Sequence, residues 1–520
     1  MTETTFAGRQ EVGSGGDKRG WVDYLLLAAP CFSSPLLLWA ENIIGVSHPG
    51  RLLTIGATAS IVAAVILATV RRLGVPGSVS LAGVWALAYV FMRGAAVVSA
   101  LGYVLAFFST VTVIVILGFL LSRRPQSPLR VIVVISSAVL VAEVGLAWYT
   151  SGVSLGADLT LPAPSDVEVA LERTPDIVLI LADAYIGLDG LERYFDIVEP
   201  AWKKELDDRG FTVPEVAYSP YVTTQTALSA ILDIAYPIGP GPGITKATNQ
   251  TLYDKVGGDN RVFRILASNG YGITMVESGW SGSACGDRID TCVPSHFLDE
   301  STYFALHKTW VGPWMRERYG YSFTVGALNA MSWLRENLGG ITHDSKPDFV
   351  IAHLEVPHPP FFLDSDCKVE TARARSGTTM QWPGTDIGFR KEAYLGQAAC
   401  FDRFVQGLIE KLGEDTFLLV AGDHGSDSHD QLVVHPSRWS EDAIRERLNV
   451  MFAYRDPDGC ELTKPILLAN VFRDVFQCLG GKAVPSLEPR MFIYAAVSFD
   501  GMPSPVVELH PSQVDELLNR

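Results

Sequence analysis

Long apolar runs fill the chain between residues 21 and 149, and the pattern changes completely after them. Five runs, each about 18–21 residues long, follow one another: Trp21–Ala40, Leu52–Val70, Val79–Val98, Leu101–Leu121 and Val131–Tyr149. A helix of this length crosses a hydrocarbon core of roughly 30 Å. The pattern therefore predicts a transmembrane domain of five helices in residues 21–150, preceded by a cytoplasmic tail of residues 1–20.

Lys and Arg residues between the runs predict the orientation of these helices, because cytoplasmic loops carry the excess of positive charge. One side of the membrane would hold only Arg51 and Arg93. The other would hold Arg9, Lys18, Arg19, Arg71, Arg72, Arg123, Arg124 and Arg130. The N-terminus is thus expected inside and the chain after Tyr149 outside. One helix in place of the third and fourth runs would reverse this, but it would be about 65 Å long.

After a polar, proline-containing linker at residues 151–174, short apolar runs alternate with amphipathic stretches. The predicted strands are Ile177–Ala182, Tyr271–Val276, Asp348–His353, Phe417–Ala421 and Leu448–Tyr454. The predicted helices are Glu199–Arg209, Thr226–Ile234, Arg261–Ser268, Arg390–Leu412 and Leu467–Leu479, with surface loops at Pro237–Gly243 and Arg373–Gly388. Apolar strands separated by helices indicate an α/β domain in residues 175–520, with a mostly parallel central sheet flanked by helices.

Charge and cysteine content separate the two parts further. Residues 1–150 carry a net charge of +4 and the whole chain −16, so the outer part is near −20 and nucleic acid is not expected as a partner. Six of the seven cysteines lie in the outer part. An even number in an oxidising compartment predicts disulfides, with the short Cys285–Cys292 loop favoured and Cys367–Cys400 and Cys460–Cys478 suggested by order alone. Six buried free thiols are the alternative.

Two predicted strands end in residues that can bind a metal. Asp183 follows the first strand, and Asp423-His424-Gly425 follows the strand Phe417–Ala421. In a parallel sheet, ligands bind beyond the carboxyl ends of the strands. A carboxylate and an imidazole side by side suit Zn²⁺ or Mn²⁺, as one or two ions. A helix cap for Asp183 and a simple turn acid for Asp423 are the alternatives.

Between these strands lies the hydroxyl-rich segment TTQTALS, residues 223–229. Thr226 would lie in the first turn of the predicted helix, where the helix dipole favours developing negative charge. A threonine hydroxyl there, beside a metal, is a candidate nucleophile. Thr223 and Thr224 are competing candidates, and either could instead cap the helix. The chemistry of the residues does not choose among the three.

Three histidines and an arginine are further candidates for contact with a substrate. His358 stands between prolines just past the strand Asp348–His353, and His435 follows His424 by eleven residues. His353, at the end of its strand, is a weaker candidate, because a hydrogen-bonded histidine in the core explains it equally well. Arg438 is also weaker, because it could simply be a solvated arginine at the surface.

The segments IVLILADAY, QTALS, PHPPF, GDHGS and VVHP together resemble the alkaline phosphatase/sulfatase superfamily, over residues from about Asp176 to Tyr494. Within it the chain is most similar to membrane-anchored phosphoethanolamine transferases and lipoteichoic acid synthase. The resemblance implies an alkaline phosphatase-like fold. Thr226 matches the family's nucleophile, with Asp183, Thr226, Asp423 and His424 as metal ligands. His358 and His435 match histidines that bind substrate or a second metal.

The resemblance implies a metal-dependent phosphotransferase with its catalytic domain outside the cell (inner) membrane. Such an enzyme would move a phospholipid head group, phosphoglycerol or phosphoethanolamine, to a cell-envelope glycan or lipid through a phosphothreonine. A hydrolase with the same site and a non-catalytic envelope binding protein are the alternatives. Two features depart from the family: the membrane transferases have Glu in place of Asp183, and no sulfatase Cys/Ser-x-Pro-x-Arg motif lies near Thr226.

Overall fold

The computed structural model describes residues 168–295, 300–307, 312–319, 322–341, 346–370, 387–482, 484–497, 499 and 503–519. It also describes five isolated helical residues within the second predicted span: Thr54, Thr58, Ile61, Val65 and Thr69. Among all these residues no helix is long and apolar enough to cross a membrane. The predicted tail, nearly all of the five spans, most of the linker and nearly all of the loop Arg373–Gly388 lie outside the described residues and stay predictions.

A six-stranded sheet forms the centre of the described domain. Its order is β4-β3-β5-β1-β6-β7. The strands are β1 (Ile177–Ala182), β3 (Gly272–Val276), β4 (Thr291–Val293), β5 (Asp348–Leu354), β6 (Phe417–Gly422) and β7 (Phe452–Arg455). All neighbouring pairs are parallel except β6 and β7. The predicted α/β domain with a mostly parallel sheet is therefore confirmed.

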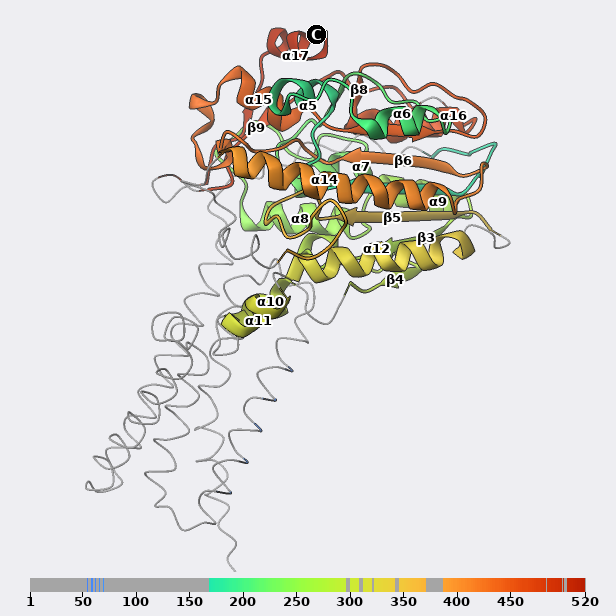
Figure 1. Cartoon of the computed structure of the whole chain (residues 1–520). Coiled ribbons are helices and arrows are strands. Elements are labelled where there is room, and N and C mark those ends of the chain that lie inside the picture. The colour runs from blue at the N-terminus through green and yellow to red at the C-terminus, as the bar shows by residue number, and fades with distance from the viewer. Residues whose placement is uncertain are drawn as a thin grey trace, which may run out of the picture. The chain divides into compact units, whose positions relative to one another are not determined.

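Helices cover both faces of this sheet (Figure 1). The central strands β1 and β6 are apolar and buried at every position, so both faces of the sheet need cover there. On one face lie α5 (Leu188–Phe195), α6 (Ala201–Asp207), α12 (Ser322–Ile341) and α14 (Ile387–Ile409). On the other lie α7 (Thr224–Asp233), α9 (Arg261–Ser268) and α16 (Val471–Cys478). Because helices cover both faces of the sheet, a ligand can bind only beyond the ends of its strands.

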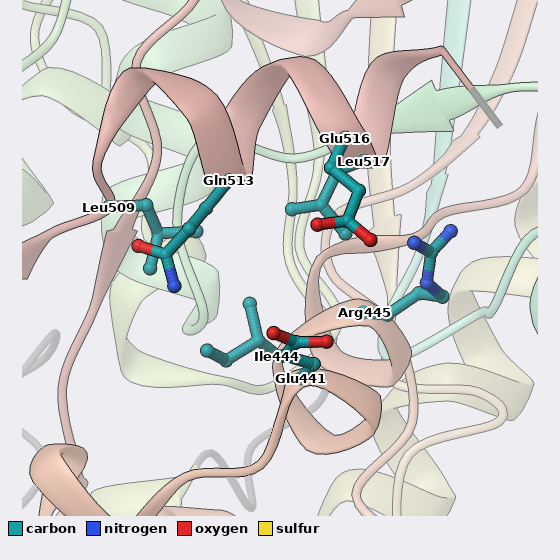
Figure 2. Close-up of a pocket in the computed structure, with 7 residues that line it drawn as sticks. All are labelled: Glu441, Ile444, Arg445, Leu509, Gln513, Glu516 and Leu517. Atoms are coloured by element: carbon teal, nitrogen blue, oxygen red, sulfur yellow. The ribbon is translucent and has the colours of Figure 1, made fainter.

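A third apolar cluster joins the C-terminal segment to the domain. It includes Tyr221, Tyr236, Ile238 and Phe492. The elements here are short: β2 (Ala217–Tyr218), β8 (Ile466–Leu467), β9 (Phe492–Ile493), β10 (Val507–Glu508), α15 (Glu441–Leu448) and α17 (Pro511–Leu518). A small pocket lies between α15 and α17, where Ile444 faces Leu509 and Leu517 (Figure 2). The described residues after Tyr494 thus pack against the domain as part of it.

The remaining elements are the helices α8 (Lys246–Val256), α10 (Glu300–His307) and α11 (Gly312–Tyr319), and the short 3-10 turns η1 (Ser281–Ser283), η2 (Gln431–Val433), η3 (Pro436–Arg438) and η4 (Leu468–Asn470). They pack on those already described, with α8 and η4 against α7.

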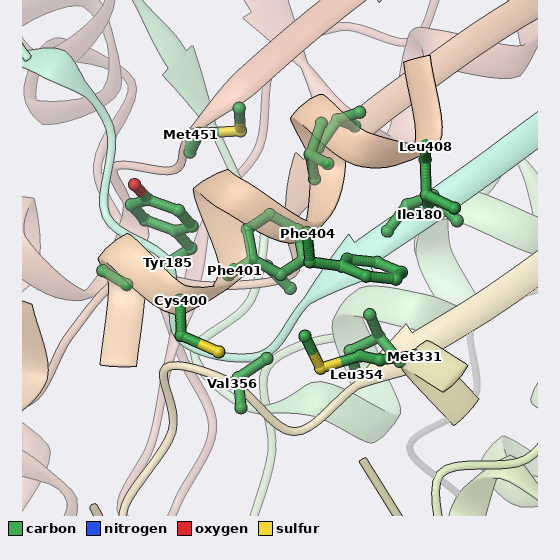
Figure 3. Packing of buried hydrophobic residues seen from close by; sticks show 14 of the residues in the cluster. Ile180, Tyr185, Met331, Leu354, Val356, Cys400, Phe401, Phe404, Leu408 and Met451 are labelled. Carbon is green, nitrogen blue, oxygen red and sulfur yellow. The ribbon is translucent and has the colours of Figure 1, made fainter. Parts of the chain in front are cut away.

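Side chains of β1 alternate between the two apolar layers, as the period of a strand requires. Ile180 packs with Met331 of α12 and Phe404 of α14, whereas Leu179 belongs to the opposite layer (Figure 3). Tyr185, just past β1, meets the ring of Phe401 edge-on at 5.7 Å. Burying aromatic side chains of this size contributes about 2–3 kcal/mol each. The layers therefore hold the end of β1 in a fixed position.

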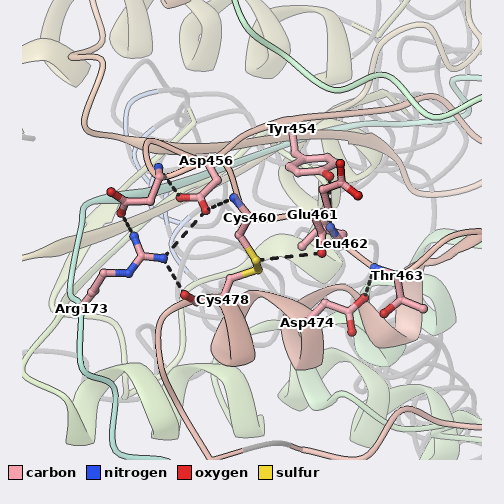
Figure 4. Close-up of a disulfide and its surroundings, with 10 residues drawn as sticks. Arg173, Tyr454, Asp456, Cys460, Glu461, Leu462, Thr463, Asp474 and Cys478 are labelled. Carbon is pink, nitrogen blue, oxygen red and sulfur yellow. Dashed lines mark hydrogen bonds and ion pairs between the residues drawn. A yellow bond between two sulfur atoms is a disulfide. The ribbon is translucent and has the colours of Figure 1, made fainter.

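Three disulfides are present: Cys285–Cys292, which its short loop favoured, and Cys367–Cys400 and Cys460–Cys478, which order alone suggested. Figure 4 shows the last of these, where Arg173 donates to the carbonyl of Cys478 at 2.5 Å and lies 3.9 Å from Asp456. The prediction of disulfides is confirmed. It agrees with an oxidising compartment for the domain.

Most predicted elements form close to their expected bounds, with three instructive differences. Helix α7 begins at Thr224, two residues before the predicted start. The last predicted strand is shorter, because Leu448 ends α15 and β7 begins only at Phe452. The segment Pro237–Gly243 is only partly a surface loop: Pro240 and Pro242 are exposed, whereas Ile238 is buried in the C-terminal apolar cluster.

Candidate active site

Three central strands deliver the candidate ligands to one place. Ala182 at the end of β1 is in register with Gly422 of β6 and Leu354 of β5. Asp183 and Asp423 therefore leave the sheet side by side. His353 lies one residue earlier, next to Leu181. All three residues are at least 95% buried, as is His424. The predicted convergence at the carboxyl edge is present, and His353 belongs to it.

Backbone contacts fix the two carboxylates. Asp423 accepts hydrogen bonds at Oδ1 from the backbone N–H of Ala184, at 2.9 Å, and from that of His424, at 2.8 Å. Ala184 has a φ of 63°, in the left-handed region that alanine rarely adopts. Its carbonyl also accepts from the Tyr394 hydroxyl at 2.9 Å. The strained turn after Asp183 thus aims its own N–H at the neighbouring acid.

Gly425 is needed for the approach of the Asp-His-Gly turn to α15. A Cβ on this residue would lie 1.9 Å from the carbonyl oxygen of Glu446. Any larger residue would push the turn away and displace His424. This close contact explains why the third residue of the triplet is glycine.

The remaining carboxylate oxygens face imidazole nitrogens without hydrogen-bonding to them. His424 Nε2 lies 3.4 Å from both Asp183 Oδ1 and Asp423 Oδ2. His353 Nε2 lies 3.8 Å from Asp183 Oδ2 and Asp423 Oδ2. Asp183 Oδ1, Asp423 Oδ2 and both ring nitrogens of His353 are buried without a hydrogen-bond partner.

These residues fit a divalent metal ion. Zinc bonds to nitrogen and oxygen of about 2.0–2.2 Å place neighbouring tetrahedral ligands roughly 3.3–3.6 Å apart. The 3.4 Å separations around His424 Nε2 fall in this range. The set of Asp183, His353 and Asp423 also forms a group compact enough to hold an ion. Buried polar atoms without partners are costly unless something occupies them.

The electrostatics of the two acids agree with this fit. Burial, and then the charge of Asp423, raise the pKa of Asp183 well above its usual value. Burial works to raise the pKa of Asp423 too, but His424 and His353 hold it below its usual range. The protein alone therefore compensates the negative charge of Asp183 poorly, and a bound cation would stabilise this carboxylate in its charged form.

Arg447, which sequence reasoning missed, joins the segment before α7 to the Asp-His-Gly turn. It is 2% exposed. Its guanidinium donates to the carbonyls of Val222 and Gly425, each at 2.8 Å, and Nη2 lies 3.2 Å from His424 Nε2. Burial, and then the charge of Arg447, lower the pKa of His424 to about 3, so the imidazole is neutral and can act as a ligand. No motif marks this arginine, because its role depends on the fold.

The three threonines before and within α7 have different surroundings. Thr223 is the N-cap residue, Thr224 the first helical residue and Thr226 the third. Thr224 Oγ1 lies 3.2 Å from His424 Nε2. Thr226 is fully buried, donates from Oγ1 to the Thr223 carbonyl at 2.9 Å and lies 2.6 Å from the Tyr494 hydroxyl. Among the described residues, Thr226 Oγ1 forms no hydrogen bond with Asp183, Asp423 or His424.

His358 lies beside the cluster at a pocket. Its ring centroid is 6.5 Å from that of His424, and its carbonyl accepts from Gln397 Nε2 at 2.8 Å. Burial, and then Arg447, lower the pKa of His358 to about 4. The pocket beside it is lined by Phe195, Tyr394, Lys391, Ser426 and Arg447. It offers aromatic walls and positive charge next to the ligand cluster.

His435 and Arg438 have contacts elsewhere. His435 Nδ1 lies 2.8 Å from Ser437 Oγ, and its ring lies 5.2 Å from that of Phe499. Arg438 is exposed and its backbone N–H donates to the carbonyl of His435 at 2.9 Å. In the described part of the chain, neither side chain has a recorded contact with the Asp-His cluster.

Two other groups of acids and cysteines do not compete as metal sites. They are Glu277 with Cys285 and Cys292, and Asp456 with Cys460 and Cys478. Both cysteine pairs are disulfides. Oxidised sulfur offers no thiolate, so among the described residues only the buried Asp-His group fits an ion.

The Sulfatase family model matches residues 202–454, which include α7 and the Asp-His-Gly turn. The chain carries a sulfatase-family domain. The predicted membership in the alkaline phosphatase/sulfatase superfamily, a superfamily of enzymes, is thereby confirmed. No curated protein is similar enough in sequence to match the chain.

Several solved structures are similar to this sulfatase-family domain. The C-terminal periplasmic domain of EptC from Escherichia coli is 14% identical, with 66% of this chain and 96% of that domain covered and a TM-score of 0.41. The soluble domain of lipooligosaccharide phosphoethanolamine transferase A from Neisseria meningitidis is 13% identical, with 62% and 94% covered and a TM-score of 0.37. Phosphonate monoester hydrolase of Agrobacterium radiobacter is 13% identical, with 63% and 81% covered and a TM-score of 0.40. These similarities concern the fold and not the activity.

Proposed function

We propose that this sulfatase-family chain is a metal-dependent phosphotransferase of the cell envelope. It moves a phospholipid head group, phosphoglycerol or phosphoethanolamine, to a glycan or lipid acceptor through a phosphothreonine. The observation that carries the proposal is the meeting of two buried acids and a neutral imidazole with a threonine hydroxyl at a helix start. Such a set serves displacement at phosphorus.

The ligands proposed for a divalent ion, zinc or manganese, are Asp183, Asp423 and His424, with a threonine hydroxyl of α7 completing the set. When bound, this ion would offset the negative charge on the non-bridging oxygens of the phosphodiester. Thr226 is the sequence-based candidate for that hydroxyl, and Thr224 is the one whose described contacts reach His424. His353 lies within reach of both acids and is available to a second ion.

The residues around the cluster support a two-step reaction. The start of α7 presents first-turn N–H groups to an anionic phosphoryl group, because Thr223 makes no side-chain cap bond to the helix. Neutral His358 can accept a proton from an incoming hydroxyl. The pocket with Phe195, Tyr394 and Lys391 accommodates the part of the donor or acceptor beyond the phosphorus. Arg447 keeps the two catalytic segments together.

The membrane is proposed as the place of this reaction. The five predicted spans and their Lys/Arg distribution put the catalytic domain outside the inner membrane. The three disulfides support that compartment. A phospholipid donor is then available at the same surface.

Product analysis tests the proposal. The full chain in vesicles with labelled phosphatidylglycerol and phosphatidylethanolamine should release diacylglycerol and, with a suitable acceptor, label it. Asp423→Asn should reduce turnover at least 100-fold. Even a mutation of a residue that only hydrogen-bonds to a metal ligand lowers metal affinity or activity by about 10–100-fold. Release of free head-group phosphate regardless of acceptor would indicate the hydrolase instead. Equal turnover by the wild type and Asp423→Asn would contradict the proposal.

A further inference from the structure

Tyr494 brings a buried hydroxyl to the start of α7 from the C-terminal part of the chain. The residue belongs to the third apolar cluster and is 3% exposed. The Sulfatase family model ends at residue 454, so this tyrosine lies outside the matched region. The family match therefore assigns it no role, and its contacts in the structure have to be considered by themselves.

Strand β9 ends one residue before Tyr494 and holds it beside the threonines. The backbone N–H of Phe492 donates to the Pro220 carbonyl at 2.9 Å, and its ring stacks on that of Tyr221 at 5.0 Å between centroids. On its other side β9 pairs with β10. The strand thus runs alongside the segment that leads into α7, and the residue after it faces the helix start.

Three hydroxyl groups meet at this point. The Tyr494 hydroxyl lies 2.6 Å from Thr226 Oγ1 and 2.5 Å from Thr223 Oγ1. Thr226 Oγ1 also donates to the Thr223 carbonyl at 2.9 Å, a bond to the preceding turn that threonine can form in a helix. All three residues are buried. Their hydroxyls therefore depend on one another for hydrogen bonds.

The protons of these hydroxyls have one consistent arrangement. A carbonyl oxygen only accepts, so the bond from Thr226 to the Thr223 carbonyl uses the Thr226 proton. The bond between Tyr494 and Thr226 then uses the proton of Tyr494, and the proton of Thr223 is left for the Tyr494 oxygen. Tyr494 is thus the hydrogen-bond donor to Thr226 Oγ1.

We propose that Tyr494 is a catalytic residue of this site, which donates a hydrogen bond to Thr226 Oγ1 as that oxygen leaves phosphorus. The inference rests on the proposed phosphotransfer, with Thr226 carrying the phosphoryl group. Negative charge collects on Oγ1 as its bond to phosphorus breaks, and a hydrogen bond to a charged oxygen is roughly twice as strong as one to a neutral oxygen. Losing one preplaced donor of this kind typically costs about 10²–10³-fold in rate.

The steps balance with the Tyr494 proton staying on its own oxygen. In the first step Thr226 Oγ1 bonds to phosphorus as the bond between phosphorus and the lipid alcohol breaks. The electron pair stays on the departing oxygen, and the Thr226 proton ends on the released diacylglycerol. In the second step the acceptor oxygen bonds to phosphorus, the bond to Oγ1 breaks with its electron pair going to Oγ1, and the acceptor's proton ends on Thr226.

Loss of this donor affects formation and breakdown of the phosphothreonine unequally. The bridging oxygen of a phosphate ester is a weaker acceptor than a hydroxyl oxygen, because phosphorus draws electron density from it. The free threonine therefore loses more stabilisation than the phosphothreonine, and the transition state loses most. Without the Tyr494 hydroxyl, the phosphothreonine should accumulate and break down slowly. A tyrosine that only held α7 in place would slow both directions alike.

Two full-length variants in detergent micelles test the proposal: Tyr494→Phe and Tyr236→Phe. Each removes one buried hydroxyl from the third apolar cluster and keeps the ring. Tyr236 is the matched control, since its hydroxyl donates to the Glu488 carbonyl at 2.6 Å and accepts from the Arg490 N–H at 3.0 Å. Thr223→Val, which removes the donor to Tyr494, is the second test in case Tyr494→Phe fails to fold.

Both readouts follow the covalent adduct. One is the fraction of the chain that carries the head-group phosphoryl group on Thr226 after incubation with zinc and labelled phosphatidylethanolamine or phosphatidylglycerol. The other is the rate at which this adduct is lost when dioleoylglycerol is added. That addition reverses the first step, so Thr226 Oγ1 must leave phosphorus.

We expect Tyr494→Phe to carry a larger adduct fraction than the wild type and to lose the adduct at least about tenfold more slowly. Tyr236→Phe should match the wild type. Thr223→Val should lose the adduct more slowly than this control but faster than Tyr494→Phe, because hydrogen bonds in a chain strengthen one another by roughly 10–30%.

Equal adduct fractions and loss rates in Tyr494→Phe and Tyr236→Phe would overturn the proposal and leave the phosphotransfer intact. Equal slowing of adduct formation and loss, or an adduct on a residue other than Thr226, would do the same. If only Thr223→Val folds, a loss rate equal to that of the control overturns it. A wild-type protein with neither turnover nor adduct would remove the proposed function itself.

Discussion

At the scale of single residues, the site depends on side chains whose partners lie far away in sequence. Arg447 connects the residue before the α7 cap, Val222, to the turn after His424 through two backbone carbonyls. The same α15 carries Glu446, which accepts from Ser426 Oγ at 2.5 Å and from the Ser428 N–H at 2.8 Å. One turn of α15 therefore supports the Asp-His-Gly segment from two sides.

A pH-dependent contribution to stability is expected from His429 and Glu446. Their hydrogen bond raises the pKa of His429 above 6.5, whereas burial is outweighed by hydrogen bonds that lower the pKa of Glu446 below 4.5. The raised pKa of His429 stabilises the folded state fully at pH values below 6.5, and this contribution is lost as the pH rises through the pKa of His429 in the folded protein. The lowered pKa of Glu446 stabilises the folded state fully at pH values above 4.5, and this contribution is lost as the pH falls through the pKa of Glu446 in the folded protein. The pair should therefore contribute most between these two values.

His429→Gln measures this contribution. At pH 6 the variant should lose about 0.5–1 kcal/mol of unfolding free energy, the range of a partly exposed ion pair, and at pH 9 clearly less. Denaturant unfolding at both pH values checks the expectation. The same loss at pH 6 and pH 9 would show that the two groups do not titrate as a pair.

At the scale of elements, α14 holds the segment that carries His358. Gln397 of α14 accepts from the backbone N–H groups of Phe362 and Leu363, at 3.0 and 3.2 Å, and donates to the His358 carbonyl. Cys400, one turn further on, is joined to Cys367. The loop after β5 is thus fastened to one helix by hydrogen bonds and a covalent bond.

The Cys367–Cys400 bond should stabilise the domain more than the Cys285–Cys292 bond. The cysteines are separated by 33 and 7 residues, respectively. The chain-entropy model then gives losses of about 3.7 and about 2.4 kcal/mol for the corresponding double serine variants. Denaturant unfolding of Cys367→Ser/Cys400→Ser beside the matched Cys285→Ser/Cys292→Ser compares them. Equal midpoints would show that loop closure does not dominate.

At the scale of the whole molecule, the sequence predicts what depends on local pattern. Apolar runs located β1 and β6 and hence Asp183 and Asp423, because the edge at which parallel strands end follows from the fold class. The short loop favoured the Cys285–Cys292 disulfide, and order alone suggested the other two pairs. The surroundings of the three threonines did not follow from the sequence, since the contacts of Thr226 with Tyr494 and of Thr224 with His424 join segments that are far apart in the chain. His353 was undervalued for the same reason: a histidine at a strand end gains meaning only when two acids face it.

The charge distribution of the whole chain agrees with a reaction at a membrane surface. Positive residues gather between the predicted spans, and the domain that carries the site is strongly acidic. A repulsive acidic surface would keep the domain from anionic polymers, so binding of the phosphoryl group must come from the site itself. The buried Asp-His cluster beside α7 offers that binding once its charge is balanced by a divalent ion.

The intact mass of the full chain after incubation with phosphatidylethanolamine tests the central claim most directly. In the presence of zinc and without an acceptor, the mass should rise by one phosphoethanolamine unit, and diacylglycerol should appear in equal amount. The increase should be absent in Asp423→Asn. An unchanged mass with phosphatidylethanolamine and phosphatidylglycerol alike, while diacylglycerol is released, would contradict a covalent phosphotransferase.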